Sequence, residues 1–380
     1  MLEVAGAEEE GEIVIELATE VRWQDRRFAI PMERIRLSER AGYDAVFTAE
    51  GFGSEGLVPL GFIAAHTEHL KLGTRLAQVT ARTPAITAMA FQTLNHLAGG
   101  DRVIVGLGSA SPLASEGLEG RPWGSPLVRM RDFVAILRQA FAGQKLDHGG
   151  AEWSAPYRGP HARGVEPASL GLDVISDIPI CVGTSGPKMT VLAAEIGDGW
   201  MPPGFAPGLM PSFLPLLEEG FARAGNGKSL QTFKIWSHVD VLVDDDVRTA
   251  MRPFKEYVVT WSQMQRPFME ARGYQDLAAR LEELIAAGQG DTVRVHKGDN
   301  LLNGGLWEEA VNAVPDEYID EGWLVGPVDR IANRVAPWLD CGLTGLVVRY
   351  GPQLTHDRMV ENLDVFTAIA EAAGKSPRRP

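Results

Sequence analysis

Two short glycine-containing segments have residue types that could bind a phosphate group. Residues 106–109 (GLGS) follow an apolar run, and residues 183–188 (GTSGPK) follow another such run and open an amphipathic segment. Backbone N–H groups at a helix start, with hydroxyls and a lysine beside them, form a site for an anion. The second segment is the better candidate for a phosphate site. An ordinary strand-to-helix turn with an N-cap would have the same composition, so both interpretations stay open.

Neither segment is one of the better-known nucleotide motifs. The dinucleotide spacing Gly-x-Gly-x-x-Gly fails after Gly106, because residue 111 is a serine. Residues 222–229 end in Gly-Lys-Ser, as a P-loop does, but they lack its first glycine and lie between a predicted helix and a predicted strand. We therefore exclude both nucleotide motifs.

Glu50 follows a predicted strand at a position that would face the mouth of a barrel. A carboxylate there can hydrogen-bond a cofactor or transfer a proton, and the alternative role is a helix cap or a salt bridge.

Two groups of residues could suggest a metal site. His66 and His69 have helical spacing, but no further ligand set accompanies them. Residues 244–246 (DDD) suit a helix cap better than a calcium loop. No metal is expected.

Short apolar runs and longer amphipathic segments alternate along the chain, which favours a parallel sheet covered by helices. Helices are predicted at residues 31–41, 84–97 and 188–196, each closed by a glycine. Such an alternation predicts a (β/α)8 TIM barrel, whose functional residues follow the carboxyl ends of the strands. The eight predicted strands are residues 13–18, 45–49, 70–77, 103–107, 178–182, 199–201, 234–243 and 345–349.

Two stretches interrupt the alternation. Residues 143–177 are rich in glycine, proline and alanine and predict a long loop, whereas residues 244–326 are mostly helical. These two stretches predict insertions after the fourth and seventh strands of the barrel. The whole chain, residues 1–380, is predicted to form a single domain. Long excursions after barrel strands usually lie at the catalytic face.

The composition excludes several classes of protein. The 36 basic and 50 acidic residues give a net charge of −14, without the basic stripe that nucleic-acid binding requires. No apolar run is long enough to span a membrane, and residues 1–12 lack the features of a signal peptide. Cys181 and Cys341 lie in apolar runs far apart in sequence, which favours reduced, buried thiols over a disulfide. We therefore expect a cytoplasmic protein with no nucleic-acid or membrane partner.

The chain resembles the luciferase-like flavin and deazaflavin oxidoreductases, specifically the branch that uses coenzyme F420. In this family the fold is a TIM barrel with a large insertion, usually a dimer, and the third strand ends in a bulge with a non-proline cis peptide. The resemblance assigns that bond to Arg75-Leu76. The matching stretches are residues 41–53 (AGYDAVFTAEGFG), 70–112, 119–138, 178–202 (IPICVGTSGPKMTVLAAEIGDGWMP) and 312–348.

The resemblance also implies which residues surround the cofactor. It gives Glu50 the catalytic position beside the ring system. The residues that it implies near the ring are Arg75, Leu76, Gln78, Gly108 and Ser109. The residues that it implies around the phosphate are Gly183, Thr184, Ser185, Gly186 and Lys188, with Arg129 reaching the same anion.

Two departures from the family pattern leave the proton donor unassigned. Members that act on a sugar phosphate or an alcohol have a histidine directly after the Glu50 position, where this chain has Gly51. The glutamate that some members place after the fourth strand is Ser111 here. The resemblance implies hydride transfer between F420 and a small organic substrate. An FMN-dependent monooxygenase and a cofactor-binding protein without catalytic activity are the alternatives.

Overall fold

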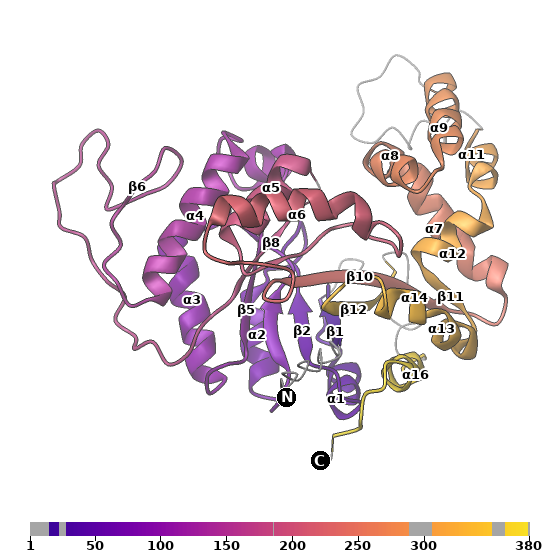
Figure 1. The fold of residues 1–380 in the computed structure, drawn as a ribbon, viewed down its shortest axis with the longest axis horizontal. Coiled ribbons are helices and arrows are strands. Elements are labelled where there is room, and N and C mark those ends of the chain that lie inside the picture. Colours follow the sequence, from indigo (N-terminus) through magenta and orange to yellow (C-terminus); the bar gives the residue numbers. More distant parts are fainter. Residues whose placement is uncertain (1–14, 23–27, 185, 289–305, 352–361, 379–380) are drawn as a thin grey trace, which may run out of the picture.

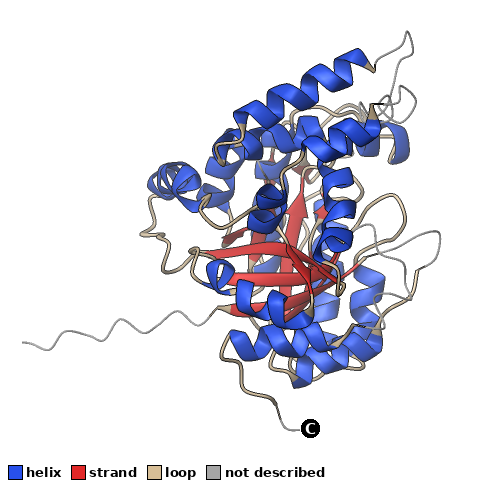
Figure 2. Ribbon diagram, turned by 90° about the vertical axis from the view of Figure 1, so that its right-hand side faces the viewer, coloured by secondary structure: helices blue, strands red, loops and turns tan. Residues whose placement is uncertain are grey.

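Eight parallel strands close into a barrel with helices around it in the computed structural model, which describes residues 15–22, 28–184, 186–288, 306–351 and 362–378 (Figures 1 and 2). The strands pair in chain order, and the last pairs with the first. The predicted TIM barrel is therefore confirmed. The barrel strands are β1 (Glu16–Val21), β2 (Ala45–Thr48), β3 (Lys71–Thr74), β5 (Val103–Gly108), β8 (Ile180–Gly183), β9 (Gly199–Trp200), β10 (Lys234–Val243) and β12 (Gly345–Tyr350).

Most residues of the barrel strands are apolar because a parallel barrel buries both faces of its sheet. Every residue of β2 and β12 is buried. The rings of Phe47 and Trp236 meet edge to face, with 5.1 Å between their centroids, in a separate cluster within the barrel. A Cβ at Gly345 would lie 2.3 Å from the Trp236 ring, so this neighbour must be small. Large and small residues thus fill the interior together.

The helices that cover the barrel begin and end at residues that the sequence marks. The Thr83 side chain caps α3 by accepting a hydrogen bond from the Ile86 N–H, and Gly99 follows the helix with φ of +82°. The predicted helix at residues 84–97 is therefore confirmed. The covering helices are α1 (Met32–Arg40), α2 (Leu57–Ala64), α3 (Pro84–Leu97), α4 (Pro126–Phe141), α5 (Pro187–Ile196), α6 (Met210–Ala224), α13 (Val328–Arg334), α14 (Ala336–Leu339) and α16 (Asp364–Ala372).

The segment between α4 and β8 contains a small hairpin, β6 (His148–Gly149) with β7 (Ser154–Ala155). Asp132 on α4 holds it, because its carboxylate accepts hydrogen bonds from the N–H groups of Glu152 and Trp153. This segment extends to the left of α3 and α4 in Figure 1. Its sequence has the composition of a loop, and the hairpin within it was not predicted.

The segment between β10 and β12 is mostly helical and forms the orange part of Figure 1. Asp246 caps the helix that begins at Val247, in agreement with the helix cap expected at residues 244–246, and a second helix starts at Ser262. Among the described residues, no helix combines the length and apolar character that crossing a bilayer requires. The segment contains α7 (Val247–Thr260), α8 (Ser262–Ala271), α9 (Gln275–Ala287), α11 (Trp307–Ala313), α12 (Asp316–Gly322) and β11 (Leu324–Gly326), a strand that pairs with β10 outside the barrel.

Candidate active site

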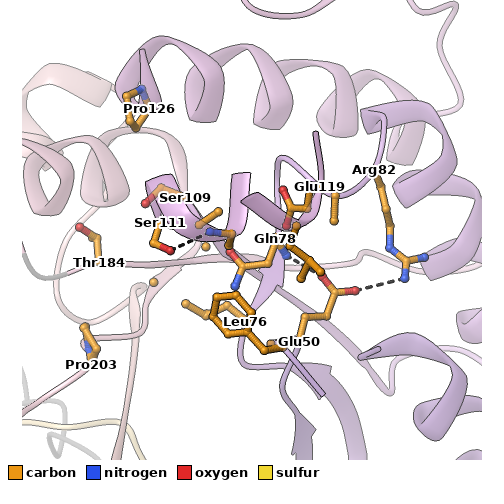
Figure 3. Close-up of a pocket in the computed structure, with 18 of the residues that line it drawn as sticks. Glu50, Leu76, Gln78, Arg82, Ser109, Ser111, Glu119, Pro126, Thr184 and Pro203 are labelled. Atoms are coloured by element: carbon orange, nitrogen blue, oxygen red, sulfur yellow. Dashed lines mark hydrogen bonds and ion pairs between the residues drawn. The ribbon is translucent and has the colours of Figure 1, made fainter. Parts of the chain in front are cut away.

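A cavity of about 880 Å³ opens at the carboxyl ends of β2, β3, β5 and β8 (Figure 3). This is the face at which TIM barrels carry their functional sites, and the volume suits a cofactor or a substrate of moderate size. The residues implied by the resemblance that line it are Glu50, Leu76, Gln78, Gly108, Ser109, Gly183, Thr184 and Gly186. The fold thus brings together residues from four strand ends.

A bulge after β3 forms the floor of the cavity. The Arg75-Leu76 peptide bond is cis, as the resemblance implied, and the chain then forms the short strand β4 (Ala77–Gln78), which pairs with β5. A Cβ at Gly183 would lie 2.0 Å from Leu76 Cδ1, and one at Gly108 would lie 3.1 Å from it. The two glycines therefore make room for Leu76 between the ends of β5 and β8.

Glu50 is held in place through both of its carboxylate oxygens. Oε2 accepts a hydrogen bond from the Gln78 N–H at 2.7 Å, and Arg82 Nη2 donates to Oε1 at 3.1 Å (Figure 3). Burial raises the pKa of Glu50, an effect that the Gln78 N–H and the Arg82 charge oppose. Glu50 thus ties the bulge to the segment before α3, and Arg82 also pairs with Glu55.

The amino end of α5 borders the opposite side of the cavity. Gly186 is the N-cap residue, and among the described residues no side chain caps the first turn. Helix starts leave their first N–H groups without partners inside the helix. The sequence left open an N-capped turn or an anion site, and the missing side-chain cap favours the anion site. Lys188 is exposed in this first turn, whereas Ser185 lies outside the described residues.

Three predicted site residues, Arg75, Arg129 and Lys188, are not among the residues that line the cavity. Arg129 on α4 is paired with Glu152, with 2.7 Å between Nη2 and Oε2, so its guanidinium anchors the segment after α4 instead of facing the cavity. Arg75 points below the bulge, into the barrel. Each arginine has a carboxylate partner that is distant in sequence, and a local motif could not reveal this.

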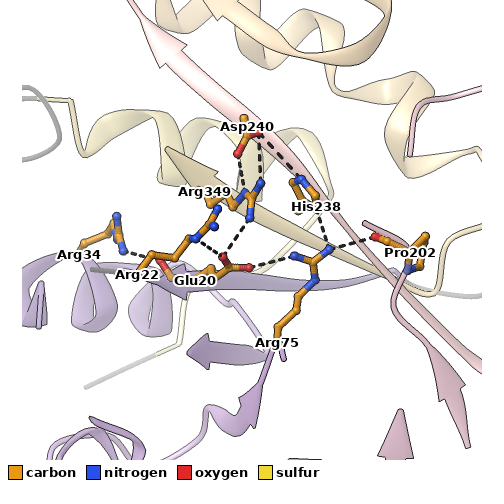
Figure 4. A network of polar contacts seen from close by, with 8 residues as sticks. All are labelled: Glu20, Arg22, Arg34, Arg75, Pro202, His238, Asp240 and Arg349. Atoms are coloured by element: carbon orange, nitrogen blue, oxygen red, sulfur yellow. Dashed lines mark hydrogen bonds and ion pairs between the residues drawn. The ribbon is translucent and has the colours of Figure 1, made fainter. Parts of the chain in front are cut away.

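The Arg75 side chain belongs to a buried polar network under the bulge (Figure 4). Its Nη1 pairs with Glu20 Oε2 at 3.0 Å, and its Nη2 donates to the Pro202 carbonyl at 3.1 Å and to His238 Nδ1 at 2.6 Å. Burial and the nearby arginines lower the pKa of His238 well below its usual value, so its ring accepts this hydrogen bond as a neutral imidazole. Arg349 joins Glu20 from the other side, at 3.0 Å. The network therefore fixes the residue that precedes Leu76.

Several lining residues were not predicted from the sequence. They contribute an arginine, two carboxylates and an aromatic ring, and no short motif marks them. Arg82 and Glu55 come from the segments before α3 and α2, whereas Glu119 and Trp123 come from the segment between β5 and α4. Their positions depend on how strand-to-helix connections meet above the barrel.

A closed (β/α)8 barrel with a cavity at the carboxyl ends of its strands defines a TIM-barrel protein with a site for small molecules. Residues 17–345 match the model of the luciferase-like monooxygenase family, and the chain belongs to that family.

Individual relatives agree with this assignment. A protein of Mycobacterium tuberculosis assigned to the coenzyme F420-dependent oxidoreductases is 34% identical over 322 residues, which cover 84% of this chain and 90% of the relative. The 5,10-methylenetetrahydromethanopterin reductase of Archaeoglobus fulgidus is 28% identical over 318 residues, which cover 82% of this chain and 87% of the relative. The solved structure of the coenzyme F420-dependent tetrahydromethanopterin reductase from Methanopyrus kandleri superposes with a TM-score of 0.71 at 19% identity, covering 94% of this chain and 98% of that one. The last similarity shows the fold alone.

Proposed function

We propose that this protein is an oxidoreductase that transfers a hydride between the deazaflavin coenzyme F420 and a small organic substrate. The relatives whose names include F420 support this cofactor over others. The observation that carries the proposal is the cavity, which joins the bulge at the end of β3 to the start of α5. One end suits a flat ring, and the other suits a phosphate.

The residues around the cavity fit such a cofactor. Gln78 Oε1 is buried and has no hydrogen-bond donor among the described residues, although Gln78 lines the cavity, so a ring N–H would satisfy it. Leu76 presents an apolar surface for the ring, and Glu50 holds the backbone of Gln78 in position. When bound, the deazaflavin supplies the hydride from ring carbon C5, while the chain orients the ring and excludes water.

The cofactor is the first point to test. F420 and FMN are offered together to the purified protein, and the captured cofactor is identified by mass spectrometry and by its absorption spectrum. Capture of F420 supports the proposal. Capture of FMN alone would favour a monooxygenase, because a flavin can activate oxygen and a deazaflavin cannot. Binding of F420 without turnover of any acceptor would favour a binding protein.

Lys188→Ala is expected to weaken F420 binding about tenfold or more, the cost of losing a hydrogen bond between charged groups. The physical reason is the position of Lys188 in the first turn of α5, where a cation adds to the N–H groups in holding a phosphate. Lys145→Ala is the matched control, because Lys145 is exposed but lies beyond the end of α4. Equal affinities of the two variants, measured by fluorescence titration, would remove Lys188 from the site.

We also propose that the protein is a single-domain, cytoplasmic homodimer. Helices α2 and α3 pack together and expose apolar side chains that a dimer would cover, among them Val58, Phe62, Ile86 and Met89. Phe62→Glu combined with Met89→Glu is expected to produce a monomer, since charges on this surface oppose its burial. Light scattering measures the mass, with Leu172→Glu in the segment after α4 as control. A monomeric wild type would contradict the proposal.

A further inference from the structure

The cavity lining contains three carboxylates and one arginine, and their hydrogen bonds separate one carboxylate from the others. Both oxygens of Glu50 are occupied, by the Gln78 N–H and by Arg82. Both oxygens of Glu55 are also occupied, because Oε2 accepts from two backbone N–H groups at the start of α2 and Oε1 pairs with Arg82. These two carboxylates hold the walls of the cavity and share a single cation.

Glu119 differs from both. It follows the π-helical turn η1 (Leu113–Leu118), between β5 and α4, and it lines the cavity (Figure 3). Its Oε2 atom is buried and has no hydrogen-bond partner among the described residues. A buried polar oxygen without a partner is costly unless a ligand satisfies it. Among the described residues, Glu119 is thus the cavity carboxyl with an oxygen that no other residue pairs.

Other groups that could exchange a proton are missing from the described lining. It includes no histidine, cysteine, lysine, tyrosine or aspartate. Its hydroxyl groups belong to serine and threonine, which are not the usual general acids. The resemblance implies a histidine and a glutamate at two positions that are Gly51 and Ser111 in this chain. The reaction proposed above therefore needs its proton from another position.

We propose that Glu119 is the catalytic residue that exchanges the proton with the substrate, an inference that rests on the proposed hydride transfer. As the carbon of a C=C, C=O or C=N bond accepts the hydride, the π electron pair of that bond moves to the second atom. That atom then bonds to the proton of the Glu119 carboxyl group, whose O–H bond breaks to leave a carboxylate. Water returns the proton to Glu119, and in the reverse direction the carboxylate removes the proton from the substrate.

Glu119→Gln tests the proposal, because it preserves the size of the side chain but removes the acid. Reduction of a panel of small conjugated enones, ketones and imines by F420H2 is expected to slow about 100-fold or more in kcat. The dissociation constant for F420 is expected to stay at its wild-type value. Glu116→Gln is the matched control, since Glu116 is exposed on η1 and only accepts a hydrogen bond from the Trp123 N–H, which a glutamine can also do.

Chemical rescue separates proton transfer from a structural role. Formate is expected to restore part of the lost rate in Glu119→Ala, because a small acid can occupy the vacated space. A Glu119→Gln variant as fast as Glu116→Gln would overturn the proposal, as would a loss of F420 affinity that accounts for the whole loss of rate. A wild type that binds F420 but reduces no acceptor would also overturn it. If the wild type does not bind F420, the proposed function itself has failed.

Discussion

Replacing Glu20 with alanine is expected to lower the free energy of unfolding by about 3 to 5 kcal/mol, measured by chemical denaturation. The Glu20 side chain is completely buried near the end of β1. Its carboxylate pairs with Arg75 and Arg349 at 3.0 Å each and with Arg22 at 3.3 Å. Without Glu20, the buried Arg75 guanidinium loses its carboxylate partner, and an uncompensated buried charge is strongly destabilising.

Glu16 provides the matched control on the same strand. It also pairs with two cations, Lys71 and Lys234, but at the other end of β1 and partly in contact with solvent. Glu16→Ala is expected to cost about 1 kcal/mol or less, because exposed ion pairs contribute little. Equal losses for Glu16→Ala and Glu20→Ala would show that the buried network does not stabilise the barrel.

The effect of Glu20 should depend on pH in a defined direction. Burial alone raises its pKa, but Arg349, Arg22 and Arg75 outweigh burial and lower the pKa to about 2. Because folding lowers this pKa, the stabilisation is complete above the ordinary value of 4.5 and is lost as the pH falls from 4.5 towards 2. The difference in stability between wild type and Glu20→Ala should therefore narrow across this range.

The fold followed from the sequence wherever burial on both faces produced an apolar run. The bounds of β1 differ from the prediction, because residues 13–18 were predicted and the strand runs from Glu16 to Val21, while residues 13 and 14 lie outside the described residues. The reason is Glu20, whose charge ends the apolar pattern although the residue is buried and paired inside the barrel. Strand β11 has only three residues and adds to the outside of β10, so it lacks a pattern of its own.

Some residues of the candidate site could be predicted from the sequence, and others could not. The turn that begins at Gly183 could be predicted because a strand, glycines and a helix start follow each other directly in sequence. Glu119 and Arg82 could not, since their place at the cavity depends on the packing of connections that no local pattern encodes. Arg129 suited an anion by charge, but its partner Glu152 lies 23 residues away, on the segment after α4.

Gly106→Ala is expected to destabilise the protein by about 3 kcal/mol, near the upper end for overpacking a core. A Cβ at Gly106 would lie 2.0 Å from the carbonyl oxygen of Thr74, which is backbone and cannot rotate away. Thr74 Oγ1 also donates to the Gly106 carbonyl at 2.8 Å and accepts from its N–H at 3.1 Å. The missing side chain thus lets β5 approach the end of β3, where the bulge begins.

Gly186→Ala is the control, because, apart from its chain neighbours, no described residue has an atom within 4 Å of a Cβ at that position. Thermal unfolding should show a large loss for Gly106→Ala and a small change for Gly186→Ala. Since the clash lies one residue before Arg75, a surviving Gly106→Ala protein should also bind F420 more weakly, through displacement of Leu76 and Gln78. If Gly106→Ala were as stable as the wild type, the bulge would tolerate a wider separation of β3 and β5. The close contact of these strands would then not determine the position of the cavity floor.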